Sequence, residues 1–267
     1  MPKTSGDELF ERYLREHGYE AGPHEPDLAE HGIAKRPDFL PQLGERQIAC
    51  EVEQFTSGAS ALERRLVDQR TVSASGKEVY GSIRNHVAKA AQQLKPLTVL
   101  ELPLVVVLAN PEGAMIDLSV QHVLSALYGD PTFTMKIDPT VGAAVGEGRL
   151  EFGRDGKLTN DHPYLSAIAL LRRREHRADR IAEIAAEERG DRDPSDFDEA
   201  STEALKLLKR LNREDLPEGD YLYVDLIETM SEAAIPLPEA WFDHERDSRW
   251  RFNADGYFEL VRGQLRS

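Results

Sequence analysis

Cysteine is nearly absent from this chain, since Cys50 is the only one among 267 residues. A single cysteine rules out an internal disulfide and fits a reducing cytoplasm. The longest apolar run, Leu102–Ala109, is far shorter than the roughly 18 residues that a membrane-spanning helix needs. The N-terminal segment also lacks the apolar stretch of a secretion signal. We therefore expect a cytoplasmic protein with no membrane partner.

Several motifs of well-known catalytic sites are missing as well. The eight histidines show neither HxxxH nor HExxH spacing and no CxxC is present, which disfavours a zinc site. The glycine-rich segment 142–148 lacks the Lys-Ser/Thr that completes a phosphate-binding P-loop. The formal net charge of −15 argues against a protein coated in basic surface. Binding of nucleic acid would require a divalent metal and a confined patch of Arg and Lys.

The order of helical and extended patterns predicts an α/β protein with three layers, α/β/α, around a central sheet. A first helix is expected from Ser5, with Ser5 and Glu8 as a capping box. A β-hairpin around Gly44 follows, and its second run alternates as a half-buried strand does. Further elements are expected over 77–95 (helix), 102–109 (strand), 119–128 (helix), 164–171 (strand), 181–185 and 205–211 (charged helices) and 221–227 (final strand).

Carboxylates gather on the predicted hairpin. Glu51 and Glu53 are two residues apart on a strand and therefore share a face. Folding about Gly44 brings Asp38 opposite them, at the roughly 5 Å spacing of cross-strand neighbours. Such a cluster repels itself unless it holds a cation, and hard oxygen ligands suit Mg²⁺ or Mn²⁺. The backbone carbonyl of Val52 is a further candidate ligand.

These residues resemble the PD-(D/E)xK, or restriction-endonuclease-like, nuclease superfamily. Pro37-Asp38, twelve further residues, Glu51-Val52-Glu53 on a strand and then an amphipathic helix follow the order of that family's motif. The resemblance covers residues 1–130, a nuclease-like core with a mixed sheet; residues 131–267 would complete the same domain with charged helical additions and a flexible acidic loop at about 188–199. It implies a Mg²⁺-dependent endonuclease that hydrolyses phosphodiester bonds, with DNA as the expected substrate.

The resemblance also assigns roles to residues. Asp38 and Glu51 would hold the metal, and Glu53 stands where the family usually has the lysine that positions the attacking water. Glu53 could itself be a ligand or a general base. Alternatively, a cation could come from the next helix, where Lys77, Arg84 and Lys89 are available, or the site could be inactive.

Other residues are candidates of lower rank. Glu8 and Glu11 match the first helix of the family, which often supplies another acidic residue, although the capping box alone explains Glu8. Lys35, Arg36 and Gln93 are candidate nucleic-acid contacts. His24, Glu25 and Asp27 could gather near the site or form a polar loop. The rival hypotheses are an inactive nuclease fold that binds nucleic acid or a protein, and a plain interaction protein; a homodimer stays open.

Overall fold

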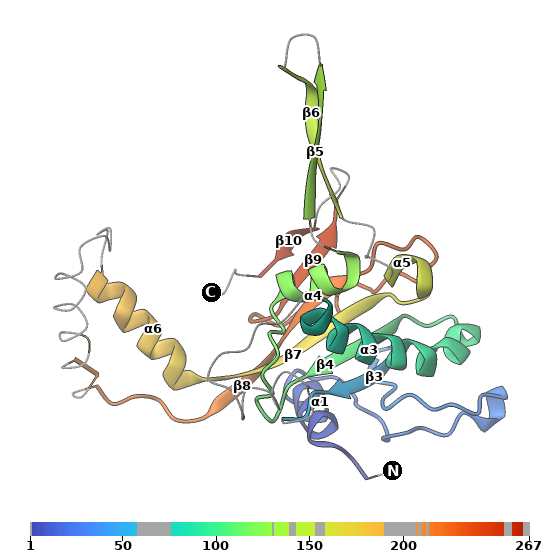
Figure 1. Ribbon diagram of the computed structural model, residues 1–267. Helices are drawn as coiled ribbons and strands as arrows, with labels where there is room; N and C mark the ends of the chain where they lie inside the picture. Colours follow the sequence, from blue (N-terminus) through green and yellow to red (C-terminus); the bar gives the residue numbers. More distant parts are fainter. Residues whose placement is uncertain are drawn as a thin grey trace. The chain divides into compact units, whose positions relative to one another are not determined.

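The computed structural model describes residues 2–57, 76–129, 131–138, 143–152, 158–189, 207, 210–211, 214–253 and 258–263 (Figure 1). Its helices and strands are, in chain order, α1 (Ser5–Glu16), η1 (Ala29–His31), β1 (Gln42–Leu43), β2 (Arg46–Gln47), β3 (Ala49–Gln54), α3 (Gly76–Leu94), η2 (Lys95–Leu100), β4 (Leu104–Ala109), α4 (Val120–Tyr128), β5 (Pro131–Asp138), β6 (Ala143–Phe152), α5 (Leu158–Asp161), β7 (Ala167–Glu175), α6 (His176–Arg189), β8 (Asp220–Glu228), β9 (Ser248–Phe252) and β10 (Phe258–Arg262).

Six strands form the central sheet in the order β10-β9-β8-β7-β4-β3. β3, β4 and β7 run parallel to one another, and β9 runs parallel to β8 but antiparallel to β10. The predicted α/β class with a mixed sheet and flanking helices is therefore confirmed. None of the described helices has the length and apolar content that crossing a membrane would need.

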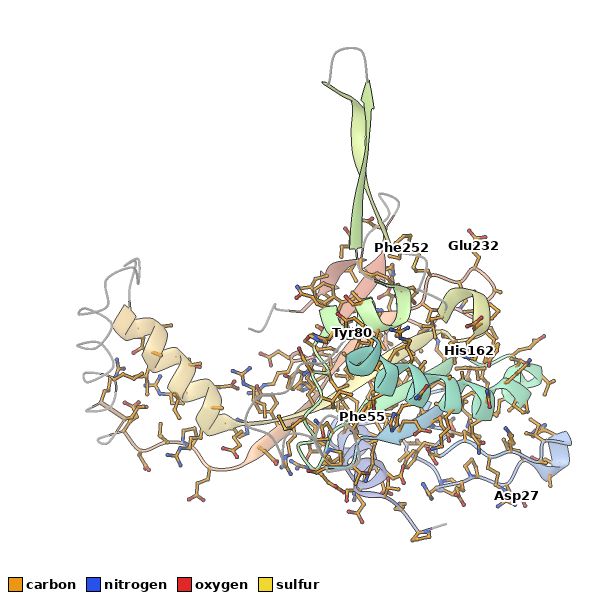
Figure 2. All side chains as sticks on the ribbon, viewed as in Figure 1. Asp27, Phe55, Tyr80, His162, Glu232 and Phe252 are labelled. Atoms are coloured by element: carbon orange, nitrogen blue, oxygen red, sulfur yellow. The ribbon has the colours of Figure 1, made fainter. Side chains whose placement is uncertain are left out.

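One face of β3 and β4 is covered by α3 and, beside it, α4 (Figure 1). In α3, Ile83, Val87 and Leu94 recur at helical spacing and are buried against the β4 side chains in a single core cluster. Phe55, labelled in Figure 2, follows β3 and places its ring 4.3 Å from that of His86 in α3. Burial of each such large apolar side chain contributes about 1.5–3 kcal/mol.

The opposite face of β3 receives α1, and Gly6 allows the close approach. A Cβ on Gly6 would lie 3.0 Å from the Gln54 Cβ, and its N–H donates to Gln54 Oε1 at 2.8 Å. With helices on both faces, residues 49–53 of β3 are all buried, so the expectation of a half-buried strand is wrong. The acidic residues of β3 are therefore inside the protein.

α1 begins at Ser5 as predicted, but its capping box lies one residue earlier than predicted. Thr4 is the N-cap and Asp7 completes the capping box, so the assignment to Ser5 and Glu8 is wrong. Asp7 Oδ2 accepts hydrogen bonds from Thr4 N at 2.7 Å and from Thr4 Oγ1 at 2.8 Å. The shift matters because it turns Asp7, and not Glu8, towards the interior: Asp7 is buried and Glu8 exposed.

A buried carboxylate near the C-terminus braces α1. Asp247 is 1% exposed and accepts hydrogen bonds from Tyr13 Oη at 2.7 Å, Val224 N at 2.8 Å and His244 N at 3.0 Å. The three donors compensate the desolvation of the charge. The contact joins the first helix to residues more than 200 positions later in the chain, and so fixes α1 on the sheet.

Residues Arg173–Leu222 form a compact unit of their own. Within that unit α6 is a charged helix, as predicted, and Arg180 pairs with Glu183 and Glu214. The acidic loop was predicted over about 188–199; residues 188–189 belong to α6, and the rest of it lies outside the described residues. Most of the predicted helix over 205–211 also lies outside them. The prediction that 221–227 is the last strand is wrong, because β9 and β10 follow β8, and the β5–β6 hairpin was not predicted.

We expect Tyr13→Phe to lower the free energy of unfolding by about 2 kcal/mol, since it removes one hydrogen bond to a buried charge. Urea denaturation measures the change. Tyr80→Phe is the matched control, because the Tyr80 ring lies against His122 and its hydroxyl bonds to no described residue. Equal losses in both variants would contradict the role given to Asp247.

Candidate metal centre

The hairpin that carries Asp38 forms as predicted. β1 and β2 pair antiparallel, with Gln42 opposite Gln47, about a turn in which Gly44 has φ +61°. A residue with a side chain rarely adopts this conformation. The pairing continues to Phe39 and Cys50, which exchange two backbone hydrogen bonds of 3.1 and 2.9 Å. Asp38 is thereby placed next to Glu51.

Pro37 stops the hairpin ladder at this point. The next hydrogen-bonded pair in the register would be residue 37 with Val52, but proline has no N–H to donate. The Val52 N–H instead donates to Asp38 Oδ2 at 2.7 Å. The N–H and C=O of one strand residue point to the same edge, so the Val52 carbonyl also faces Asp38. The role of the Val52 carbonyl as a metal ligand stays a prediction.

Asp7, His24 and Asp38 form a compact group beside this edge. One ligand atom from each can be chosen so that all three lie within 4.8 Å of one another. His24 Nε2 lies 3.5 Å from Asp7 Oδ2 and 3.8 Å from Asp38 Oδ1. Nε2 is buried and has no hydrogen-bond partner. A buried polar atom without a partner is costly, and a metal ion would satisfy it.

A strained loop holds His24 in place. The N–H of Glu25 donates to the Asp38 carbonyl at 3.0 Å, and Glu25 has φ +50°, a left-handed conformation that is uncommon for a residue with a side chain. The His24 ring also packs edge-on against Phe39, with centroids 5.3 Å apart. Such strain tends to persist where function requires the geometry.

Glu51 is the most perturbed acid of the group. Its side chain is buried, and Oε2 has no hydrogen-bond partner. Burial, followed by repulsion from Asp38 and Glu53, raises the pKa of Glu51 to about 9. Burial also raises the pKa of Asp38 to about 6, with Asp7 and Glu53 adding to the rise and Val52 N–H and His24 opposing it. For both carboxylates burial and the neighbouring acids therefore outweigh the nearby positive charge, which is His24 for Asp38 and Lys89 for Glu51.

Glu53 meets a cation from the neighbouring helix. Lys89 Nζ of α3 lies 2.7 Å from Glu53 Oε1 and 3.0 Å from Oε2. Glu53 is buried, whereas the Lys89 side chain is 75% exposed. The hydrogen bond to Glu53 raises the pKa of Lys89, so the amine is charged at neutral pH. Lys89 and Arg84 are the predicted cations of this helix whose side chains are described, and of these two Lys89 contacts the acidic strand.

The other predicted residues lie elsewhere. Glu8 is exposed, and Glu11 pairs with Lys3 at 2.8 Å. Arg84 lines a cavity between α3 and α4, and the Lys77 side chain is outside the described residues. Neither Glu8 nor Glu11 joins the acidic group.

The segment 35–36 is held against the end of α3. Lys35 Nζ donates to the Gln92 carbonyl at 3.1 Å, and Gln93 Nε2 donates to the Arg36 carbonyl at 3.3 Å. Gln92 and Gln93 lie within about one helical turn of Lys89 on α3. Lys35 and Arg36 are therefore attached to the part of α3 that follows Lys89, and the Arg36 guanidinium lies 3.5 Å from Asp27 Oδ1.

The donor atoms suit a divalent cation. Carboxylate oxygens, a backbone carbonyl and one imidazole nitrogen are ligands of Mg²⁺ and Mn²⁺, and the imidazole favours Mn²⁺. The unpartnered atoms of Glu51 and His24 are those that a bound ion would satisfy. Asp7, His24 and Asp38 therefore could hold a metal ion.

Comparison of the chain with protein-family models, with curated proteins and with solved structures gave no match. The function must therefore be argued from the arrangement of these residues.

We expect the stability of the metal-free protein to fall as pH rises. The pKa of Glu51 is 4.5 in the unfolded chain and about 9 when folded, so its stabilising contribution is full below the lower value and is lost towards the higher one. Urea denaturation in EDTA, between about pH 5 and pH 9, measures the slope. Glu51→Gln should flatten it, whereas the exposed Glu45→Gln should not. Parallel curves for the wild type and Glu51→Gln would contradict the assignment.

Proposed function

We propose that this chain is a metal-dependent nuclease with a restriction-endonuclease-like core, and that it hydrolyses phosphodiester bonds of DNA. The observation that carries the proposal is the group of Asp7, His24 and Asp38 at the edge of β3, with the buried Glu51 next to Asp38 and Lys89 paired with Glu53 on the same strand. A structural protein gains nothing from burying several acids together, because each desolvated carboxylate costs stability. Sites of this kind are characteristic of metal-assisted catalysis.

Asp38, Glu51 and the Val52 carbonyl would hold a divalent ion, with Asp7 and His24 as neighbouring ligands. The bound ion would lower the pKa of water and stabilise charge on the phosphoryl oxygens. The Asp38 carboxylate is oriented before any ion binds, because the Val52 N–H holds Oδ2 and thereby sets the direction of Oδ1. Glu51 brings an oxygen without a protein partner.

Lys89 supplies the positive charge that the nuclease motif normally takes from the strand itself. Its stem starts on α3, and both oxygens of Glu53 hold its ammonium group next to β3. Because the side chain is largely exposed, the ammonium can also contact a phosphate at the mouth of the site. Glu53 then acts as the residue that positions Lys89, which explains a glutamate where a lysine is usual.

The same side of the protein offers contacts for a phosphate backbone. Lys35 and Arg36 are exposed and precede Pro37-Asp38 directly. Their attachment to Gln92 and Gln93 sets them beside the part of α3 that carries Lys89. A small basic group of this kind can receive nucleic acid although the whole chain has a net charge of −15.

We expect the wild type to nick supercoiled plasmid with Mn²⁺ or Mg²⁺ and not with EDTA. Asp38→Ala and Glu51→Gln should each reduce cleavage by about 100-fold or more, because both remove a ligand. Lys89→Met should reduce the rate by about 100-fold while metal binding persists, because it removes one charged donor. Calorimetric titration measures metal binding, and gel electrophoresis measures cleavage.

Lys95→Met, at the start of η2, is the control for the loss of a lysine and should cleave as the wild type does. Metal binding without cleavage of plasmid, linear DNA or RNA would point to an inactive nuclease fold that binds nucleic acid. Absence of metal binding in the wild type would contradict the proposed centre itself.

The imidazole of His24 leads to a separate prediction, about which metal ion binds more tightly. We expect Mn²⁺ to bind more tightly than Mg²⁺, because imidazole is a better ligand for Mn²⁺. His24→Gln should weaken Mn²⁺ binding by about tenfold or more and narrow the difference between the two ions. Titration of both proteins with both ions measures this, and His31→Gln, on the exposed η1, is the control. An unchanged preference in His24→Gln would exclude His24 as a ligand.

A further inference from the structure

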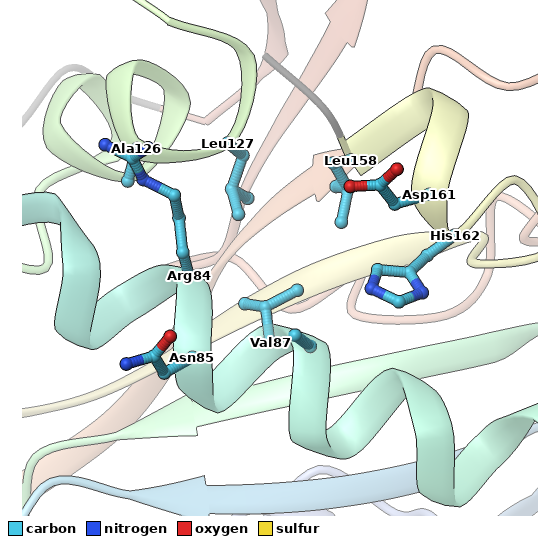
Figure 3. Close-up of a pocket in the computed structure, with 9 residues that line it drawn as sticks. Arg84, Asn85, Val87, Ala126, Leu127, Leu158, Asp161 and His162 are labelled. Atoms are coloured by element: carbon cyan, nitrogen blue, oxygen red, sulfur yellow. The ribbon is translucent and has the colours of Figure 1, made fainter. Parts of the chain in front are cut away.

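A cavity of about 240 Å³ lies between α3, α4 and α5, apart from the acidic group (Figure 3). Arg84 and Lys89 are five residues apart on α3, so their side chains leave the helix about 140° apart. The cavity and the acidic group therefore occupy different flanks of one helix. Its lining includes Arg84, Val87, Leu127, Leu158, Asp161 and His162.

Arg84 provides a positive charge on one side of the cavity. Its side chain extends from α3 towards α4 (Figure 3). The Nε atom is buried and has no hydrogen-bond partner. A buried guanidinium donor without an acceptor costs stability, and a carboxylate or phosphate would satisfy it with a charge-assisted hydrogen bond. This donor indicates an anionic ligand.

The opposite side of the cavity offers hydrogen-bond acceptors. Asp161 and His162 lie there, across from Arg84 (Figure 3). The Tyr164 hydroxyl donates to the Ala91 carbonyl at 3.0 Å, so its oxygen accepts from His162 Nδ1 at 3.2 Å. In the neutral ring this arrangement leaves Nε2 as an acceptor. Burial lowers the pKa of His162, which favours the neutral ring.

Apolar side chains separate the two polar ends. Val87, Leu127 and Leu158 are each at most 5% exposed and line the middle of the cavity. A water occupies about 30 Å³ in the liquid, so the volume corresponds to roughly eight waters. A single substituted ring is of a size that fits this space. Apolar walls with a few convergent polar groups are typical of small-molecule sites.

We propose that this cavity binds a small organic carboxylate: a ring-sized apolar body with the carboxylate at Arg84 and a hydroxyl or amine donor at Asp161 and His162. Each end of the ligand then meets the complementary group, and the ring displaces water from the leucine and valine side chains. The site is independent of the proposed nuclease chemistry, because it needs neither metal nor nucleic acid.

The test uses the full chain with 4-hydroxybenzoate, benzoate and 4-hydroxyphenylacetate as probes, followed by calorimetry and by the thermal unfolding midpoint. We expect at least one acid to bind at millimolar concentrations or below and to raise the midpoint. The neutral analogue 4-hydroxybenzamide should bind about tenfold more weakly than 4-hydroxybenzoate, since it loses the ion pair. Arg84→Met should weaken acid binding by about tenfold or more, and Ala126→Leu should block it by filling the space.

Arg84→Met should leave the metal-free, ligand-free protein at least as stable as the wild type, because the buried Nε has no partner to lose. A merely structural arginine would give the opposite result. Arg46→Met, on the exposed hairpin, is the control for the loss of charge and should bind the acids as the wild type does. Failure of all three acids to bind, or equal binding in Arg84→Met, would overturn the proposal. Inorganic phosphate that binds as tightly as the acids would also overturn it, because the ring would then contribute nothing.

Discussion

Within the described part of the chain, the outer edge of β3 has no backbone partner beyond Cys50, and the Asp38 carboxylate takes that place at Val52. The hydrogen bond from Val52 N to Asp38 Oδ2 follows directly from Pro37, which cannot continue the ladder. A side-chain carboxylate thus replaces a backbone carbonyl as the acceptor at this strand edge, and it places the edge at the centre of an acidic group. The loop that carries His24 depends on it too, since Glu25 N–H donates to the Asp38 carbonyl.

This arrangement is held together by the surrounding structure and not by its own contacts. Burial of Glu51, followed by its repulsion from Asp38 and Glu53, opposes folding with this acid ionised and raises its pKa. Apolar side chains buried between β3 and the helices on both of its faces offset this cost. Asp247 also fixes α1 through its hydrogen bond from Tyr13. The group is therefore a strained element in a well-packed frame, which is the usual relation between a functional site and its scaffold.

Much of the frame could be predicted from the sequence, because α3 and β4 have strong periodic patterns, and Gly44 marks a turn. The hairpin then placed Asp38 beside Glu51 correctly. Asp7 was missed because Thr4 and Ser5 are both good N-caps, and an error of one residue rotates a different acid inward. The role of Lys89 required the packing of α3 on β3, a contact between residues 36 positions apart that local spacing does not encode.

The net charge of the acidic group bears on the proposed binding of a phosphodiester. Glu51, with a pKa of about 9, keeps its proton at neutral pH in the metal-free protein, but Asp7, Asp38 and Glu53 still outnumber the Lys89 ammonium group and would repel a phosphodiester. A divalent ion reduces this excess and at the same time attracts the phosphate oxygens. In the proposed nuclease, the Glu53–Lys89 pair stands in place of the strand lysine of the motif, and the acidic group then keeps more negative charge than a lone lysine would leave it. Binding of substrate should therefore depend on the metal more strongly than in a site whose lysine is unpaired.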